Sequence, residues 1–249
     1  MTQIISVISG KGGVGKTTFV ANLGAALAEL GQKVLVIDGN LSGANLGLHL
    51  GLSNFYPFSL NDVLRGTVSI SHSLYRHKLG FDVIPASLID IEVNPRRLKY
   101  VLSETIADKD FVIIDSAAGI DNEVRAAIEA SDSVIIVTNP EIPAIVDALR
   151  AKTLAEKSKK TILGVVLNKV RNEKFELSDK ETENILDAPI IARIPHHKKV
   201  RESIAAKTPV VAYAPCSSPS VEIKKLSYML IGKEPPSFGL LYRLRNLLS

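Results

Sequence analysis

The sequence predicts an α/β protein: one domain with a doubly wound, mostly parallel sheet and helices on both faces. Runs of about four to eight apolar and β-branched residues recur along the chain, which is typical of strands buried on both sides. Longer stretches with apolar residues at helical spacing separate these runs, as in repeated βαβ units. A glycine-rich turn joins the first strand to the first helix at residues 10–16. A chain of 249 residues is long enough for such a fold as a single domain.

The composition is that of an ordinary globular protein, with 46% hydrophobic and 22% charged residues. A single cysteine, Cys216, excludes an internal disulfide and a multi-cysteine cluster within one chain, and it favours a reducing cytoplasm. No apolar run approaches the length of about eighteen residues that a spanning helix needs, and no secretory signal is recognisable. We therefore expect any membrane contact to be peripheral. The net charge of +4 is a mild bias, compatible with an anionic partner surface.

The first strand, at residues 4–8, leads into a phosphate-binding loop. Residues 10–17 satisfy the pattern G-x-x-x-x-G-K-[ST], in which backbone N–H groups turn inward around phosphate oxygens at a helix N-terminus. We expect Lys16 to reach the β and γ phosphates of a nucleotide and Thr17 to ligate Mg²⁺. The helix predicted after the loop runs over 17–30 and stops at Gly31. The predicted nucleotide-binding residues of the loop are Gly10, Lys11, Gly12, Gly13, Val14, Gly15, Lys16, Thr17 and Thr18.

Two later strands are predicted to end in carboxylates. Residues 33–38 and 110–115 are apolar runs that finish at Asp38 and Asp115. Ligands bind outside the carboxyl ends of the strands in open α/β sheets, so both carboxylates are expected to face the phosphates. Asp38, Asp115 and Thr17 are therefore the candidate Mg²⁺ ligands. The alternative for Asp115 is a structural role, in which it only caps the turn that follows.

The remaining elements continue the alternation. A short helix at 59–65 has Ser59 as its predicted N-cap and Asp62 at its third position. His72 and His77 are spaced too irregularly for a metal pair, and we expect surface or core roles for them. The other expected elements are strands at 81–85, 133–138, 161–167 and 190–194, and helices at 95–106, at 142–157, from 197 to 206 and at 218–231.

A second lysine in the loop narrows the interpretation. Lys11 follows the first glycine, and the run 11–18 resembles the deviant Walker A motif of the MinD/ParA/nitrogenase-iron-protein group of P-loop ATPases. In that family the extra lysine crosses a dimer interface to the partner's nucleotide, so the resemblance implies a homodimer that encloses ATP. Residues 115–119 resemble the family's Walker B and switch II segment, with Ala117 in place of proline. Residues 138–141 match the Thr-Asn-Pro-Glu turn of MinD-like proteins.

The same resemblance assigns further roles. The family carries Asp-x-Asp after the second strand, and its second aspartate positions or activates the attacking water. Asn40 stands there in this chain and has no carboxylate, so it can only orient the water, and slow hydrolysis is expected. Asn168, and the turn at Pro195 and His196, correspond to family positions at the adenine. The predicted catalytic residues are Lys11, Lys16, Asp38 and Asn40.

The last stretch of the chain is predicted to be separate from the domain at 1–231. Residues 232–237 form a proline-stiffened linker, and residues 238–249 form an amphipathic helix whose leucines share an arc of about 120°. Its arginines flank that arc, which suits anionic headgroups. The tail can instead pack on the domain or on another chain, but MinD proteins, which this plan resembles, end in a membrane-targeting helix. The predicted membrane residues are Phe238, Leu240, Leu241, Arg243, Leu244, Arg245, Leu247 and Leu248.

These features together predict an Mg-ATP-binding homodimeric ATPase of the MinD type. We expect it to be cytoplasmic and peripherally membrane-associated, with a regulatory protein partner and a role in placing the division site or another assembly. Two alternatives stay open. A ParA-like DNA-partition ATPase would bind DNA nonspecifically through a basic patch, whereas specific nucleic-acid binding is not expected. A metabolic enzyme of the dethiobiotin-synthetase type would need a second small-molecule pocket, which the sequence does not identify.

Overall fold

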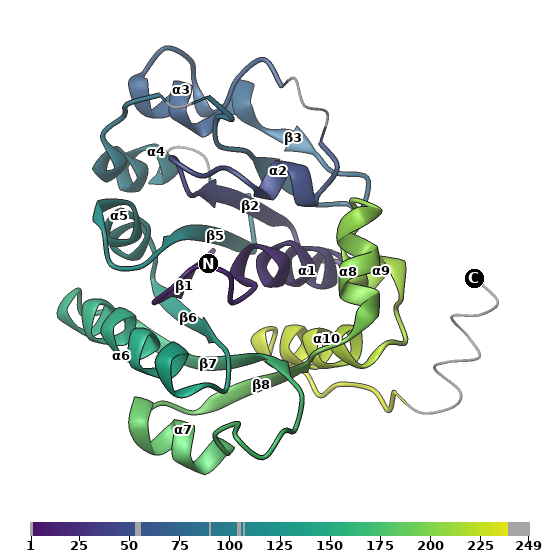
Figure 1. Ribbon diagram of the computed structural model, residues 1–249. Helices are drawn as coiled ribbons and strands as arrows, with labels where there is room; N and C mark the ends of the chain where they lie inside the picture. Colours follow the sequence, from purple (N-terminus) through teal and green to yellow (C-terminus); the bar gives the residue numbers. More distant parts are fainter. Residues whose placement is uncertain (1, 53–55, 90, 104–105, 107, 239–249) are drawn as a thin grey trace.

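A computed structural model describes residues 2–52, 56–89, 91–103, 106 and 108–238 (Figure 1). An eight-stranded sheet in the order β3-β4-β2-β5-β1-β6-β7-β8 crosses this part of the chain. Only β3 and β4 pair antiparallel, so the predicted mostly parallel sheet is confirmed. The strands are β1 (Gln3–Ser9), β2 (Val34–Gly39), β3 (Tyr75–Arg76), β4 (Asp82–Ile84), β5 (Phe111–Ala118), β6 (Ser133–Thr138), β7 (Thr161–Val170) and β8 (Ile190–Pro195).

Helices cover both faces of the sheet, as predicted (Figure 1). Buried side chains of one face pack with α1 (Lys16–Glu29), α2 (Leu46–His49), α9 (Val210–Tyr213) and α10 (Ser218–Leu230). Those of the other face pack with α3 (Leu60–Arg65), α4 (Leu98–Ser103), α5 (Asn122–Ala130), α6 (Ile142–Lys157) and α7 (Asp179–Leu186). The helix α8 (Lys198–Ala205) follows β8, and short 3-10 helices span Ile70–Ser73 and Pro95–Arg97.

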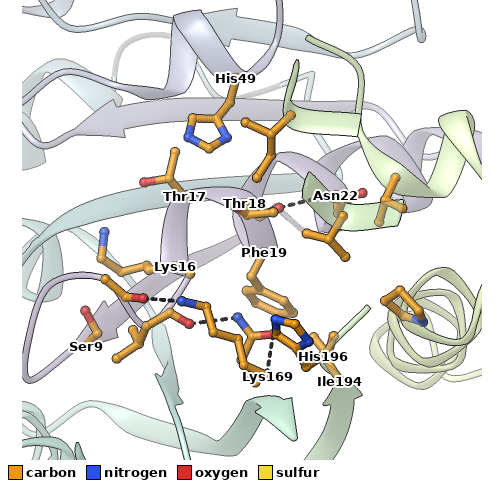
Figure 2. A pocket seen from close by; sticks show the side chains of 18 of the residues that line it. Ser9, Lys16, Thr17, Thr18, Phe19, Asn22, His49, Lys169, Ile194 and His196 are labelled. Carbon is orange, nitrogen blue, oxygen red and sulfur yellow. Dashed lines mark hydrogen bonds between the residues drawn. The ribbon is translucent and has the colours of Figure 1, made fainter. Parts of the chain in front are cut away.

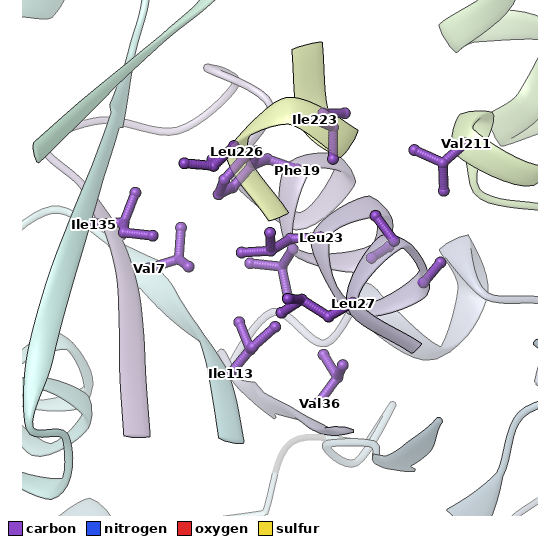
Figure 3. Close-up of a cluster of buried hydrophobic side chains, with 14 of the residues drawn as sticks. Val7, Phe19, Leu23, Leu27, Val36, Ile113, Ile135, Val211, Ile223 and Leu226 are labelled. Atoms are coloured by element: carbon purple, nitrogen blue, oxygen red, sulfur yellow. The ribbon is translucent and has the colours of Figure 1, made fainter. Parts of the chain in front are cut away.

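The apolar pattern of the strands produces this layering. Successive side chains of a strand point to opposite faces, and in β1 Ile5 and Val7 join one core while Ile4 and Ile8 join the cores of the other face. Figure 3 shows Leu23 and Leu27 of α1 packed among side chains from the sheet, with α10 beside them. The helix that follows the phosphate loop is thus held in the centre of the molecule.

Several predicted boundaries were wrong. The strand predicted to end at Asp115 continues to Ala118, because Ser116 and Ala118 still pair with the neighbouring strands β2 and β1. The helix predicted at 95–106 is a 3-10 turn over Pro95–Arg97 followed by α4. The N-caps there and at α3 are as predicted: Asn94 accepts from the Arg96 N–H at 3.1 Å, and Ser59 forms a capping box with Asp62.

The domain ends close to the predicted boundary. The helix α10 stops at Leu230, and residues 233–237 of the predicted linker are exposed. Phe238 is half-buried, and the other predicted membrane residues, from Leu240 onward, lie outside the described residues. No helix in the described ranges is long and apolar enough to cross a membrane.

Candidate nucleotide-binding site

A cavity of about 510 Å³ surrounds the start of α1 at the carboxyl edge of the sheet (Figure 2). It contains the predicted loop and the predicted base-contact residues together. Asp38 and Asp115, which were predicted to face the phosphates, are not on its wall, and no other carboxylate of the described residues lines it. The predicted residues on its wall are Lys11, Gly12, Gly13, Val14, Gly15, Lys16, Thr17, Thr18, Asn40, Asn168, Pro195 and His196. The cavity is therefore cationic and suits a phosphate-bearing ligand.

The phosphate loop turns through two glycines in the left-handed region. Gly13 has a φ of 80°, and Gly15, the N-cap of α1, has a φ of 95°. Such angles favour glycine, and they let consecutive N–H groups face one concave side. Gly10 is not on the cavity wall: a Cβ there would lie 1.9 Å from the Asp147 carbonyl oxygen of α6. Gly10 therefore allows the loop to begin against α6, and the structure shows no contact of Gly10 with the cavity.

Lys16 is buried and forms an ion pair with Asp115, with 2.7 Å between Nζ and Oδ1. The ammonium also donates to the Ser116 carbonyl oxygen. The second carboxylate oxygen of Asp115, Oδ2, is buried and has no hydrogen-bond partner among the described residues. A buried, unpartnered carboxylate oxygen is costly, and a hard cation held by oxygen ligands would satisfy it.

Asp38 lies directly opposite Asp115 in the pairing of β2 with β5. Its carboxylate accepts from the backbone N–H groups of Asn40 at 3.2 Å, Asn45 at 3.1 Å and Leu46 at 3.0 Å. Burial, and then the negative charge of Asp115, raise the pKa of Asp38 to about 7, although these N–H groups act in the opposite direction. Two adjacent carboxylates with an unfilled oxygen fit a divalent cation, whose charge would relieve their repulsion.

The segment after β2 is folded back on itself. The Asn40 side chain donates to the Gly43 carbonyl oxygen at 2.5 Å, and the Asn45 side chain donates to the same oxygen at 2.8 Å. Because Asp38 accepts from the backbone of this segment, the carboxylate and the two asparagines form one connected network beside the cavity. Asn40 therefore lies at the predicted place, half-buried on the cavity wall.

Three polar side chains from the ends of β6 and β7 donate to backbone carbonyl oxygens of the phosphate loop, and two of them, Asn168 and Lys169, also line the cavity. Asn168 donates to the Val14 carbonyl oxygen at 2.8 Å, and buried Asn139 donates to it at 3.4 Å. Lys169 donates from Nζ to the Gly13 carbonyl oxygen at 2.6 Å (Figure 2). The sequence assigned Asn168 to the adenine and gave no role to Asn139 or Lys169, because no motif encodes contacts to a backbone carbonyl.

His49 and Ile194 of the cavity wall were missed, whereas their neighbour there, His196, was predicted. His49 lies beside Thr17 and Thr18, while Ile194 and His196 lie beside Lys169 (Figure 2). Burial lowers the pKa of His49, and the charge of Asp115 partly offsets this. Apolar side chains of α8, α9 and α10 complete the wall, and the sequence gives no signal for them because they have the pattern of ordinary core residues. They are Val200, Ile204, Val210, Pro219 and Ile223.

Comparison with known sequences places this site in a described family. Residues 5–210 match the family described as the CobQ/CobB/MinD/ParA nucleotide binding domain. An uncharacterized ATP-binding protein of Methanocaldococcus jannaschii is 40% identical over 236 residues, which cover 93% of this chain and 89% of that protein. The septum site-determining protein MinD of Thermotoga maritima is 38% identical over 210 residues, which cover 80% and 78%.

Solved structures agree with these sequence matches. MinD of Pyrococcus horikoshii in complex with Mg-ADP has a TM-score of 0.88 at 34% identity, covering 92% of this chain and 96% of that one. The MinD of a MinC:MinD complex from Aquifex aeolicus has a TM-score of 0.86 at 33% identity, covering 94% and 98%. A ParA family ATPase from Chlorobium tepidum, at 24% identity and a TM-score of 0.80, shares the fold.

Proposed function

This chain belongs to the MinD/ParA family of nucleotide-binding proteins, and we propose that within it the protein is a MinD-type switch driven by ATP. In this proposal it binds Mg-ATP, forms a homodimer, binds an anionic membrane surface through its tail and is released after hydrolysis. Its role is to place the division site or another assembly. The observation that best supports this proposal is that the phosphate loop, through its Lys16, meets the Asp38–Asp115 pair at one edge of the sheet.

Each residue of the site has a defined task in ATP binding. Backbone N–H groups of the loop bind the phosphates, and Lys16 exchanges its Asp115 partner for the β and γ phosphate oxygens. The residues fit Mg²⁺: Thr17 and Asp115 would hold it with Asp38 behind them, and the ion would supply neutralisation of phosphate charge. The relative from Pyrococcus horikoshii was solved with Mg-ADP, which supports the binding of an adenine nucleotide and of Mg²⁺ by this chain.

Hydrolysis is the step that this chain performs slowly. A water that attacks the γ phosphate needs orientation and a proton acceptor, and the Asn40 amide supplies only the orientation. Members of the MinD group are ATPases, so we assign ATP hydrolysis to this protein, with Asn40 limiting its rate. A slow step prolongs the ATP-bound state and with it the dimer.

Dimerisation and partner binding complete the switch. Lys11 lies on the cavity wall, and in the proposed dimer its ammonium contacts the nucleotide of the other subunit. Two tails then face one membrane, and linking two weak binding sites raises the overall affinity by orders of magnitude, about 10² to 10⁴. A MinC:MinD complex is known for a similar protein, so we propose a regulatory protein partner for this chain as well.

Co-sedimentation with liposomes tests this proposal. We expect the full-length protein to sediment with vesicles that contain anionic phosphatidylglycerol in the presence of Mg-ATP, and much less with ADP or no nucleotide. A chain that ends at Ser237 should stay in the supernatant under all three conditions. An Arg243→Gln, Arg245→Gln double variant should bind less than the full-length protein, because it loses the attraction to anionic headgroups.

Two controls separate electrostatic binding to the vesicles from apolar binding and from misfolding of the truncated chain. Neutral phosphatidylcholine vesicles measure apolar binding alone, and circular dichroism shows whether the truncated chain is folded. If the full-length and truncated proteins sediment equally with anionic vesicles, the tail is not a membrane anchor. ATP-independent binding of the full-length protein would contradict the switch.

A further inference from the structure

We propose that Lys169 is a positioning residue for phosphate binding, which it assists by fixing the direction of a backbone N–H group in the phosphate loop. This rests on the proposed binding of ATP at this site. The Lys169 ammonium donates to the Gly13 carbonyl oxygen at 2.6 Å, and its Cε lies 3.7 Å from where a Cβ of Gly15 would be. The side chain therefore extends along the loop, with its ammonium at Gly13 and its stem at Gly15.

The peptide geometry explains the effect of this contact. In a trans peptide the carbonyl of one residue and the N–H of the next point in opposite directions. A donor that fixes the Gly13 carbonyl therefore also fixes the Val14 N–H, which points in the opposite direction and is one of the loop groups proposed to bind the phosphates. Asn168 does the same for the next peptide, because it holds the Val14 carbonyl and so directs the Gly15 N–H.

The backbone of Lys169 is itself held in an unusual conformation. Its φ is 59°, in the left-handed region that residues with a side chain rarely adopt. The Lys169 N–H donates to the Asn168 side-chain oxygen at 2.9 Å, and Asn139 donates to the Asn168 carbonyl oxygen at 2.9 Å. Strain of this kind persists where the surroundings impose it, and here it directs the lysine to the loop.

Close approach is possible because the loop carries glycine at the contact. A Cβ on Gly15 would lie 2.3 Å from the Asn168 side-chain nitrogen, so a larger residue at this position would push Asn168 away from the loop. The clamp, defined as Asn139, Asn168 and Lys169, thus connects the ends of β6 and β7 to the loop. The next residue, Val170, accepts from the His196 N–H at 2.8 Å, which links the clamp to the predicted base-contact turn.

Lys169→Met tests the inference, because methionine keeps much of the aliphatic stem and loses the ammonium. We expect affinity for both ATP and ADP, measured by calorimetry in Mg²⁺, to fall about tenfold, the usual effect of losing a charged hydrogen bond. In the nucleotide-free protein, amide hydrogen exchange at Val14 should become several-fold faster. Lys174→Met, a change on the exposed connection between β7 and α7, is the matched control and should alter neither.

A second variant keeps the test decisive if Lys169→Met does not fold. Lys169→Gly accepts the left-handed backbone without strain and also lacks the ammonium, so it should reproduce both effects even if the methionine variant is unstable. If nucleotide-free exchange at Val14 is unchanged in both variants, Lys169 does not position the loop, whatever happens to affinity. This readout needs no nucleotide, so its outcome is independent of whether the wild-type protein is an ATP switch.

Discussion

In the proposed function, Asn40 limits the step that follows ATP binding. Its side chain is a hydrogen-bond donor to the Gly43 carbonyl oxygen, and its backbone N–H donates to Asp38. Both contacts stabilise the segment after β2, and neither needs a proton acceptor. The residue therefore supports the structure of the segment without supplying the base that hydrolysis uses.

Asn40→Asp should raise the ATP turnover rate by about tenfold or more, because it introduces a carboxylate that can accept a proton from the attacking water. Steady-state phosphate release under saturating Mg-ATP measures this. Asn94→Asp is the matched control: Asn94 caps the turn at Pro95–Arg97 far along the chain, and aspartate caps equally well. An unchanged rate in Asn40→Asp would show that another group activates the water.

The individual residues of the site were predictable where their role is carried by a motif. Lys16 and Thr17 lie on the cavity wall, as the phosphate-loop pattern predicted, and Asp115 forms an ion pair with Lys16 without lining the cavity. Asn139 lay in a turn that was recognised, and Lys169 was not singled out at all, because the contacts of both residues are to backbone carbonyls. Such contacts depend on how the ends of β6, β7 and the loop meet in space, which local sequence does not encode.

Among the elements, the β3–β4 hairpin depends on a buried histidine. His77 lies between these strands with 4% of its surface exposed. Its Nε2 lies 3.0 Å from the Leu50 carbonyl oxygen, its Nδ1 accepts from the Leu79 N–H at 3.2 Å, and its ring lies against Phe81. A neutral imidazole that donates from Nε2 satisfies both hydrogen bonds, so the ring connects the hairpin to the end of α2.

Acid should therefore destabilise this hairpin. Burial lowers the pKa of His77 below its ordinary value of 6.5, so the unfolded chain takes up a proton at a higher pH than the folded chain. The stabilisation is complete above about pH 6.5 and is lost as the pH falls below it. Urea unfolding should show a larger loss of stability between pH 7.5 and 5.5 in the wild type than in His77→Gln.

His72→Gln provides the control, since His72 is an exposed histidine near the same hairpin. It should retain the pH dependence of the wild type. If His77→Gln shows the same loss of stability on acidification as the wild type, titration of His77 does not govern the stability of the hairpin.

Length alone did not decide which elements were predicted: α3, with six residues, was predicted, whereas α5, with nine, and α7, with eight, were not. Strands such as β6 and helices such as α6 have the predicted bounds, because their patterns are long and uninterrupted. The four-residue helix α2 and the two-residue strand β3 were missed, since neither is long enough for periodicity to show. The end of β5 was missed for a different reason: Ser116–Ala118 are small residues without an apolar signal, and pairing with neighbours makes them a strand.

At the scale of the whole molecule, the predicted dimer depends on Lys11. Lys11 is half-buried on the cavity wall, and within the described residues its ammonium has no hydrogen bond or ion pair. The predicted dimer gives this ammonium a partner in the nucleotide of the other subunit. One interface then contains two nucleotides and two lysines, so ATP binding and dimerisation favour each other by linkage.

Lys11→Ala should therefore remain monomeric in Mg-ATP, whereas the wild type should become dimeric in Mg-ATP and stay monomeric in ADP. Light scattering after size exclusion measures the mass directly. The variant should still bind ATP within about tenfold of the wild type, because it retains Lys16 and the loop N–H groups that hold the phosphates. Lys180→Ala, an exposed change on α7, is the control and should dimerise normally. Dimerisation of Lys11→Ala at wild-type levels would show that Lys11 does not join the two subunits. A wild-type protein that is monomeric in Mg-ATP would show that the mechanism does not involve a dimer.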